Sequence, residues 1–282
     1  MNVQLPKEYK VRKRDIVIYT VCIVICVVAL TVVATMQVLG EGVTNKVFHV
    51  NKLQVASEEE QVKLRSDFEN MFTNQITGQI NGIEKNDENR DYVYTSYENQ
   101  DNVSGNYILN VHIPNFNIKD DKLNEINNRI STEYKQRVNQ ILNSTGNQII
   151  YSVEYRGYVE NDILFLVIRS KLKESNNAQI QMIYTYNYDL KDKKEITFSE
   201  MIEKLDYNKD DVQNAIKQYI ESQENNSKSL KNLGYGIYVR NSKDDMYKIE
   251  NTKQFFMKDG KIYVVYPYGN NSATSEMDIV II

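Results

Sequence analysis

Residues 149–190, IIYSVEYRGYVENDILFLVIRSKLKESNNAQIQMIYTYNYDL, contain three stretches rich in β-branched and aromatic residues. These stretches run from Ile149 to Tyr158, from Ile163 to Leu172 and from Gln179 to Leu190, and short polar segments join them. Such stretches predict β-strands, and links this short require neighbouring strands to run antiparallel. The centre of the chain therefore predicts an antiparallel sheet.

Alternating and apolar runs on both sides of this central stretch predict further strands. Pro114 directly follows one of them and is expected to end it, because proline has no N–H to donate to a strand. Asp259-Gly260 divides another run and is typical of a two-residue hairpin turn. The predicted strands are residues 92–97, 107–113, 235–240, 255–266 and 278–282.

Helices are predicted between these groups of strands. Asp120 opens the clearest amphipathic helix, which closes near Gly146, and Asp210 opens another. Capping boxes at Ser57–Glu60 and Thr197–Glu200 predict two more helix starts. Helices that lie between blocks of antiparallel strands place the chain in the α+β class.

The segment Ile16–Leu39 predicts a single transmembrane helix. Its 24 residues carry no charge, and at about 1.5 Å per residue they can cross about 30 Å of hydrocarbon. A cleavable signal peptide is the alternative, but its apolar region is shorter, and Ala34-Thr35-Met36 matches its cleavage site poorly. Five basic and two acidic residues precede the segment, so residues 1–15 are expected in the cytoplasm and the C-terminal part outside the cell membrane.

Residues 40–90 are expected to form a stalk, an amphipathic helix and a linker. The linker is assigned to Thr77–Arg90, which is polar and rich in Gly, Asn and Asp. Residues 91–282 then form the extracytoplasmic α+β domain, with 91–146 and 147–282 as possible sub-units.

The composition narrows the function classes. The chain has a net charge of −4, and setting aside the +3 of the basic tail leaves about −7 for the outer part, which disfavours nucleic acid as a partner. Both cysteines, Cys22 and Cys26, lie in the apolar segment, so the outer part has no disulfide and no cysteine nucleophile. Abundant Asn, Lys, Ile and Tyr reflects AT-rich coding and indicates a low-GC bacterium.

Motifs for catalysis or metal binding are missing from the sequence. The two histidines are His49 in the stalk and His112 in a predicted strand, too few for a histidine-based metal site. Glu276 and Asp278 could form a glycosidase-like carboxylate pair, but most acidic pairs on a strand share a face without such a role. We therefore predict no catalytic residue, no metal site and no cofactor.

Tyrosine is the most suggestive residue type, with 21 Tyr against 8 Phe. Tyrosine offers rigid amphipathic area and is common in binding surfaces, although it also packs in strands and cores. A tyrosine-rich sheet face is the predicted ligand-binding surface. Its residues are Tyr155, Tyr158, Tyr186, Tyr188, Tyr266 and Tyr268.

Several patterns between Tyr92 and Ile282 resemble a known extracytoplasmic domain. They are residues 113–118 (IPNFNI), Ile126-Asn127, 163–168 (ILFLVI), 184–190 (YTYNYDL) and 255–282. The domain belongs to peptidoglycan deacetylases of the PdaC type and anti-sigma factors of the RsiV type in Gram-positive bacteria, and residues 269–278 look like the ending of clostridial membrane proteins. The resemblance implies an α+β binding or sensing module without catalytic activity of its own.

We expect a membrane-anchored, non-enzymatic binding or sensing module at the cell envelope, whose ligand is a cell-wall component or an extracellular protein. The alternatives are a cell-wall-modifying hydrolase that uses acidic residues, and a signalling subunit that acts through its membrane helix. The anti-sigma role implied by the resemblance does not carry over, because about 15 residues before the span are too few to hold a sigma factor.

Overall fold

The computed structural model describes residues 53, 56–78, 80–146, 148–235, 238–268 and 277–282. The segment Leu53–Ile282 forms one compact unit. Within the described residues, no helix is both long and apolar enough to cross a membrane. The predicted transmembrane helix Ile16–Leu39 and its cytoplasmic tail lie outside the described residues, so the anchor and its orientation stay predictions.

Helices and two sheets are combined in this unit, which confirms the α+β class. The strands are β1 (Gln75–Thr77), β2 (Val93–Val103), β3 (Tyr107–Phe116), β4 (Ile149–Glu160), β5 (Ile163–Glu174), β6 (Ile180–Asp189), β7 (Lys194–Glu195), β8 (Gln254–Lys258), β9 (Lys261–Pro267) and β10 (Met277–Ile281). The helices are α2 (Glu58–Asn70), α3 (Asp121–Leu142), α4 (Phe198–Lys204) and α5 (Lys209–Asn232), with short 3₁₀ helices η1 (Asp245–Tyr247) and η2 (Ile249–Asn251).

The large sheet has the strand order β2-β3-β4-β5-β6-β7, and β1 pairs with β4 beyond the residues of β4 that pair with β3. The predicted antiparallel pairing of β4, β5 and β6 is confirmed. In contrast, β3 and β1 both pair with β4 in parallel, so the large sheet is mixed and the prediction of an antiparallel sheet holds only for its other pairs. The reason for the first pairing is α3, a 22-residue helix that carries the chain back to the end of the sheet where β3 began.

The predicted hairpin of residues 92–113 is present as β2 and β3, but β3 continues through Pro114 to Phe116. The prediction that Pro114 ends the strand is therefore wrong. Thr95 pairs with Pro114 and Tyr97 with Ile113, so the residue between them on β2 is an extra one, as in a β-bulge. Such a bulge accommodates a residue that lacks an N–H.

Strand β5 is buried on both faces, which explains its unbroken apolar run. Side chains alternate along a strand, so Ile163, Phe165 and Val167 join one core. The intervening residues, from Leu164 to Ile168, join the other core, together with α3. Both hydrophobic cores thus meet at the centre of this strand.

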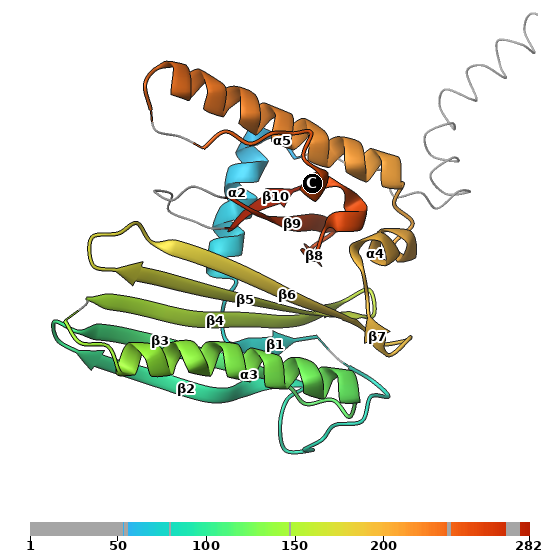
Figure 1. Ribbon diagram of the computed structural model, residues 1–282. Coiled ribbons are helices and arrows are strands. Elements are labelled where there is room, and N and C mark those ends of the chain that lie inside the picture. The colour runs from blue at the N-terminus through green and yellow to red at the C-terminus, as the bar shows by residue number, and fades with distance from the viewer. Residues whose placement is uncertain (1–52, 54–55, 79, 147, 236–237, 269–276) are drawn as a thin grey trace, which may run out of the picture. The chain divides into compact units, whose positions relative to one another are not determined.

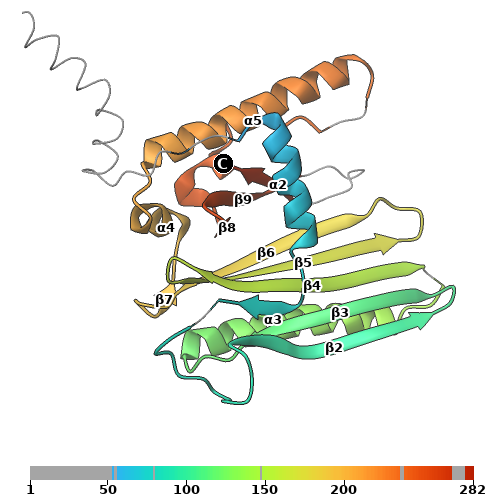
Figure 2. The same cartoon turned by 180° about the vertical axis from the view of Figure 1, so that it is seen from behind.

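The small sheet, in the order β10-β9-β8, lies on the side of the large sheet away from α3 (Figure 1). In both views, α5 lies on the side of the small sheet that faces away from the large sheet, so the small sheet is enclosed between α5 and the large sheet (Figure 2). Val212, Ile216 and Ile220 of α5 pack in the same core as the small sheet. The predicted helix start at Thr197–Glu200 is confirmed as a complete capping box on α4.

Predictions for the C-terminal part have mixed outcomes. Asp259 and Gly260 have φ angles of 52° and 73°, as the predicted hairpin turn requires, and the predicted final strand is confirmed as β10. The predicted strand 235–240 is wrong for its described residues, because Tyr235 and residues 238–240 lie in no strand. The two described tyrosines of this segment are 60% and 38% exposed, so its apolar appearance did not indicate core packing.

Helix α2, predicted within residues 40–90 and outside the α+β domain, belongs to the same compact unit. Ser57 accepts a hydrogen bond from the Glu60 N–H as predicted, but the Glu60 carboxylate pairs with Lys261 of β9 at 3.1 Å instead of closing the capping box. Arg169 of β5 is 5% exposed and donates to the Glu69 carboxylate of α2 at 2.7 Å. The compact unit therefore begins ahead of the predicted boundary at residue 91, and the pairing of β3 with β4 crosses the possible division at 146/147.

Candidate functional site

The six tyrosines predicted to share a sheet face are distributed over both sides of the large sheet. Three contribute to the core beneath α3, two to the core around the small sheet, and one lies over the guanidinium of Arg240. In that order they are Tyr155, Tyr186 and Tyr188, then Tyr158 and Tyr266, and then Tyr268. The structure therefore does not bring them together as one surface.

Four of these tyrosines are buried, and each of their hydroxyl groups has a partner inside the fold. The pairs are Tyr155 with Thr95 Oγ1 (3.0 Å), Tyr158 with the Met257 carbonyl (2.7 Å), Tyr188 with Asp120 Oδ2 (3.0 Å) and Tyr266 with Thr252 Oγ1 (3.2 Å). Burial raises the pKa of all four hydroxyls. In this structure these groups hold elements together, and their ligand-binding role stays a prediction.

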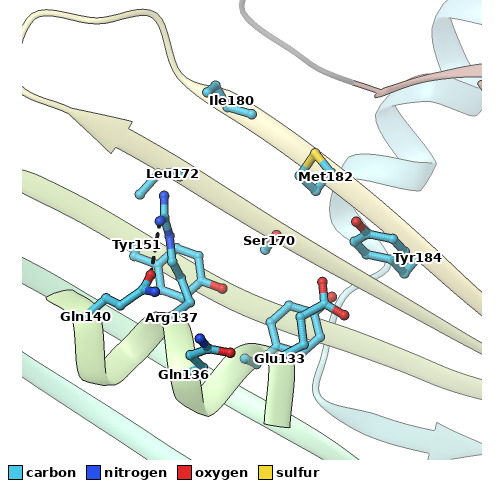
Figure 3. A pocket seen from close by; sticks show the side chains of 11 residues that line it. Glu133, Gln136, Arg137, Gln140, Tyr151, Ser170, Leu172, Ile180, Met182 and Tyr184 are labelled. Carbon is cyan, nitrogen blue, oxygen red and sulfur yellow. Dashed lines mark hydrogen bonds between the residues drawn. The ribbon is translucent and has the colours of Figure 1, made fainter. Parts of the chain in front are cut away.

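A pocket of about 400 Å³ opens between α3 and the sides of β4, β5 and β6 that face it (Figure 3). That volume is within the range typical of small-molecule sites. Its lining residues are Glu133, Tyr134, Gln136, Arg137 and Gln140 from α3, and Tyr151, Ser170, Leu172, Ile180, Met182 and Tyr184 from the strands. Eight of these eleven side chains can form hydrogen bonds, so the pocket suits a polar ligand.

The pocket begins where side-chain size changes along β5. Leu164, Leu166 and Ile168 fill the space beneath α3, but Ser170 is the next residue on that face. Its neighbours across the sheet are Val153 on β4 and Met182 on β6. A serine leaves space that a leucine or isoleucine would fill in a close-packed core.

Helix α3 presents a polar stripe to this space. Glu133, Gln136, Arg137 and Gln140 are spaced by three or four residues and therefore share one side of the helix. The apolar stripe beside it, which includes Val138, is buried against the sheet. The pocket thus lies at the boundary between the buried and polar sides of α3.

Arg137 supplies the positive charge of the pocket and is loosely held. Its Nη1 donates to Gln140 Oε1 at 3.3 Å, and its Nη2 lies 3.5 Å from Glu174 Oε1. Both distances are long for hydrogen bonds of a guanidinium, and the side chain is 41% exposed. The guanidinium fork can therefore turn to an anionic ligand at little energetic cost.

Glu133 supplies the negative charge, one helical turn before Arg137. Desolvation raises the pKa of its carboxyl, and the nearby Arg129 guanidinium opposes this shift. In Figure 3, Arg137 extends beside Tyr151 and Leu172, whereas Glu133 lies toward Tyr184. The two charges consequently occupy different ends of the pocket.

Two tyrosines in the wall differ in how their hydroxyl groups are satisfied. The Tyr134 hydroxyl is buried and has no hydrogen-bond partner among the described residues, and burial raises its pKa. Burial also raises the pKa of the Tyr151 hydroxyl, but the Ser170 side chain opposes this shift. Of these two hydroxyl groups, that of Tyr134 is therefore the unsatisfied one.

The sequence-based choice of tyrosines misses this site. Tyr151 and Tyr184 occupy the same strands as four of the six predicted residues, and Tyr134 lies on the predicted helix. The available signal was the polar stripe 133–140 next to a tyrosine on the apolar side of α3. That signal indicates a pocket only when it is known which strands lie opposite α3.

The proposed carboxylate pair finds no support at Asp278, whose two oxygens pair with Arg65 and Arg240 at 3.0 Å each. Glu276 lies outside the described residues. His112 is on β3 within a polar network that includes Gln100. Within the described part of the chain, no three His, Cys, Asp or Glu side chains are grouped as a metal site would need.

A second hollow, of about 650 Å³, lies between the start of α5 and residues 242–250. Lysines line it, but two of them already pair with carboxylates: Lys209 with Glu203 and Lys248 with Asp245. Exposed ion pairs of this kind contribute little energy, and they do not indicate which ligand the hollow would bind. The pocket beneath α3, with its aromatic wall and separated charges, is the better-formed site.

Comparison with known proteins gives little further guidance. No protein-family model matches the sequence, and no curated protein matches it. Similar solved structures include a DUF3298 family protein from Pseudomonas aeruginosa, with a TM-score of 0.36, and a member of the DUF3298 family from Bacteroides fragilis, with a TM-score of 0.31. Each is 11% identical over 62% of this chain, and the matches cover 78% and 80% of those chains. Identities and TM-scores this low assign neither a shared fold nor a function to this chain.

Proposed function

We propose that this chain is a membrane-anchored, non-enzymatic binding or sensing module of the cell envelope, with the pocket beneath α3 as a ligand site. The ligand is a cell-wall component or an extracellular protein that presents a polar group to the pocket. The observation that carries the proposal is the pocket of about 400 Å³, which combines three tyrosines with two separated charges.

The site is better suited to binding than to hydrolysis. A glycosidase uses two carboxyl groups about 5–10 Å apart across its cleft. Among the described residues that line the pocket, Glu133 is the one acidic residue. The hydrolase alternative therefore has no carboxylate pair at this site.

Binding can be tested with the full chain in detergent micelles, mixed with purified peptidoglycan and separately with lysozyme as a cationic extracellular protein. We expect retention on one of these two ligands. A folded sample that is retained on neither would contradict the proposal.

A matched pair of variants tests whether the pocket is the site. Gln136→Trp places a large ring at the mouth of the pocket, whereas Gln218→Trp places the same ring on an exposed position of α5. Binding is expected to weaken in the first variant and to stay unchanged in the second. Equal binding by both variants would show that the ligand uses another surface.

A further inference from the structure

We infer that the pocket beneath α3 binds a short peptide that carries both a free carboxylate and a cationic amine. Arg137 would bind the carboxylate, and Glu133 would bind the amine. This inference rests on the proposed function, because it assigns a ligand class to the same site. It goes beyond that function by naming the groups that decide specificity.

The carboxylate end follows from the geometry of Arg137. A guanidinium offers parallel N–H groups that match the two oxygens of a carboxylate, as they also match a phosphate, and the cationic partner that Glu133 calls for is joined to a carboxylate in a peptide. The existing contacts of Arg137, at 3.3 Å to Gln140 and 3.5 Å to Glu174, are long enough to be exchanged for a shorter pair. Tyr151 and Leu172 line the pocket beside it, so the residue that carries the carboxylate would pack against them.

The amine end follows from the position of Glu133. The positive group that acts on its carboxylate is Arg129, also on α3, while tyrosines on β4 and β6 face it from the sheet. Arg129 lies over the ring of Tyr186 at 5.8 Å and outside the pocket lining. A ligand ammonium group in the pocket would therefore reach Glu133 without displacing a residue of the lining.

The middle of the pocket suits a peptide linkage. Gln136 and Gln140 each carry an amide that can both donate to and accept from a peptide group. Leu172, Ile180 and Met182 form an apolar wall that can pack against small side chains. A neutral sugar would satisfy the amides but would leave both charges without partners, which makes the charged peptide the better match.

Five small probes separate these contributions. Two are the L,L and D,D forms of alanyl-alanine, two are the N-acetylated derivative and the C-terminal amide of the better-bound form, and the fifth is N-acetylglucosamine. Calorimetry with the full chain in detergent micelles gives each dissociation constant. For the better-bound form, removing either charge by acetylation or amidation is expected to weaken binding about tenfold, as the loss of one charge-assisted contact implies.

Variants assign each charge to its residue. Arg137→Gln should bind the free peptide and its C-terminal amide equally, and Glu133→Gln should bind the free peptide and its acetylated derivative equally. Arg90→Gln and Glu125→Gln, which change exposed residues outside the pocket lining, should retain both differences. Arg137→Lys keeps the charge but loses the fork, so it should retain part of the carboxylate preference even if Arg137→Gln folds poorly.

The outcomes distinguish this inference from the proposed function. Tight binding of N-acetylglucosamine or of peptidoglycan, with no preference among the three peptides, would overturn the inference and leave the proposed function standing. Charge preferences that persist in Arg137→Gln and Glu133→Gln would also overturn it. Failure of all small probes together with failure to retain peptidoglycan or lysozyme would overturn both.

Discussion

The Tyr134 hydroxyl offers the sharpest test of how the pocket wall is built. This hydroxyl is buried without a partner among the described residues, whereas the Tyr151 hydroxyl in the same wall interacts with Ser170. Replacing each tyrosine by phenylalanine removes one oxygen from nearly the same environment. The two variants are expected to change stability in opposite directions.

The magnitude follows from the cost of burying a polar group. A buried hydroxyl without a hydrogen bond costs about 1–3 kcal/mol, and Tyr134 is only 3% exposed. Tyr134→Phe removes that cost and leaves a small void, so the free energy of unfolding should rise by about 1 kcal/mol. Tyr151→Phe removes a hydroxyl that interacts with Ser170, so the free energy should fall, by up to about 1 kcal/mol.

Urea unfolding of the full chain in one detergent, followed by far-ultraviolet circular dichroism, measures both changes. Equal slopes against urea concentration would show that the variants differ in stability and not in the surface exposed on unfolding. If Tyr134→Phe lowers stability as much as Tyr151→Phe, the Tyr134 hydroxyl has a partner such as a bound water molecule. That result would refute the reasoning.

Three further predictions concern other parts of the fold. Arg169→Ala should lower the free energy of unfolding by about 2–4 kcal/mol, because the carboxylates of Glu69 and Glu154 both lose their buried partner. Lys171→Ala removes only a more exposed pair and should change the free energy by less than about 1 kcal/mol. Similar losses for the two variants in urea unfolding would contradict this. Asn127→Ala should cost about 2 kcal/mol, because the side chain accepts from the N–H and donates to the carbonyl of Phe116, at 2.7 and 2.8 Å. In thermal unfolding at neutral pH, Asn127→Asp should be no more stable than Asn127→Ala, because its carboxylate cannot donate to the carbonyl; a higher stability of the Asp variant would contradict this. The Lys194 ammonium and the Thr197 cap lower the pKa of Glu200 to about 2, so the contribution of Glu200 to stability is complete above pH 4.5 and is lost as the pH falls toward 2. Glu200→Gln should therefore make the urea midpoint of unfolding depend less on pH over that window, by less than about 1 kcal/mol for so exposed a group. An unchanged pH dependence of the midpoint would contradict this.

The candidate site illustrates the limit of sequence reasoning for function. Tyrosines at alternating positions indicate strands correctly, but they do not indicate which face meets a cavity. Tyr155 and Tyr188 turned out to be buried, with hydroxyl groups that hold β2 and the start of α3 in place. The pocket instead depends on Ser170, a residue with no distinctive sequence context, because its small size matters only beneath α3.

Asn127 shows the same limit for the fold. On the sequence it is a polar interruption of an amphipathic helix, and in the structure it is 7% exposed and bonds to the backbone of β3. A buried amide is tolerated only where partners satisfy it, so its position reports a contact with a distant strand. Without that strand, the pattern of α3 does not reveal which neighbour it docks against.

Local sequence patterns were enough to predict the α+β class, the three central strands, the long amphipathic helix and the hairpin turn at Asp259-Gly260. These features depend on side-chain periodicity and turn chemistry, which are properties of neighbouring residues. Only the tertiary structure decided the parallel pairing of β3 with β4, the packing of α2 into the same unit, and the pocket between α3 and β4–β6. Those features depend on which distant segments meet, and local periodicity carries no information about that choice.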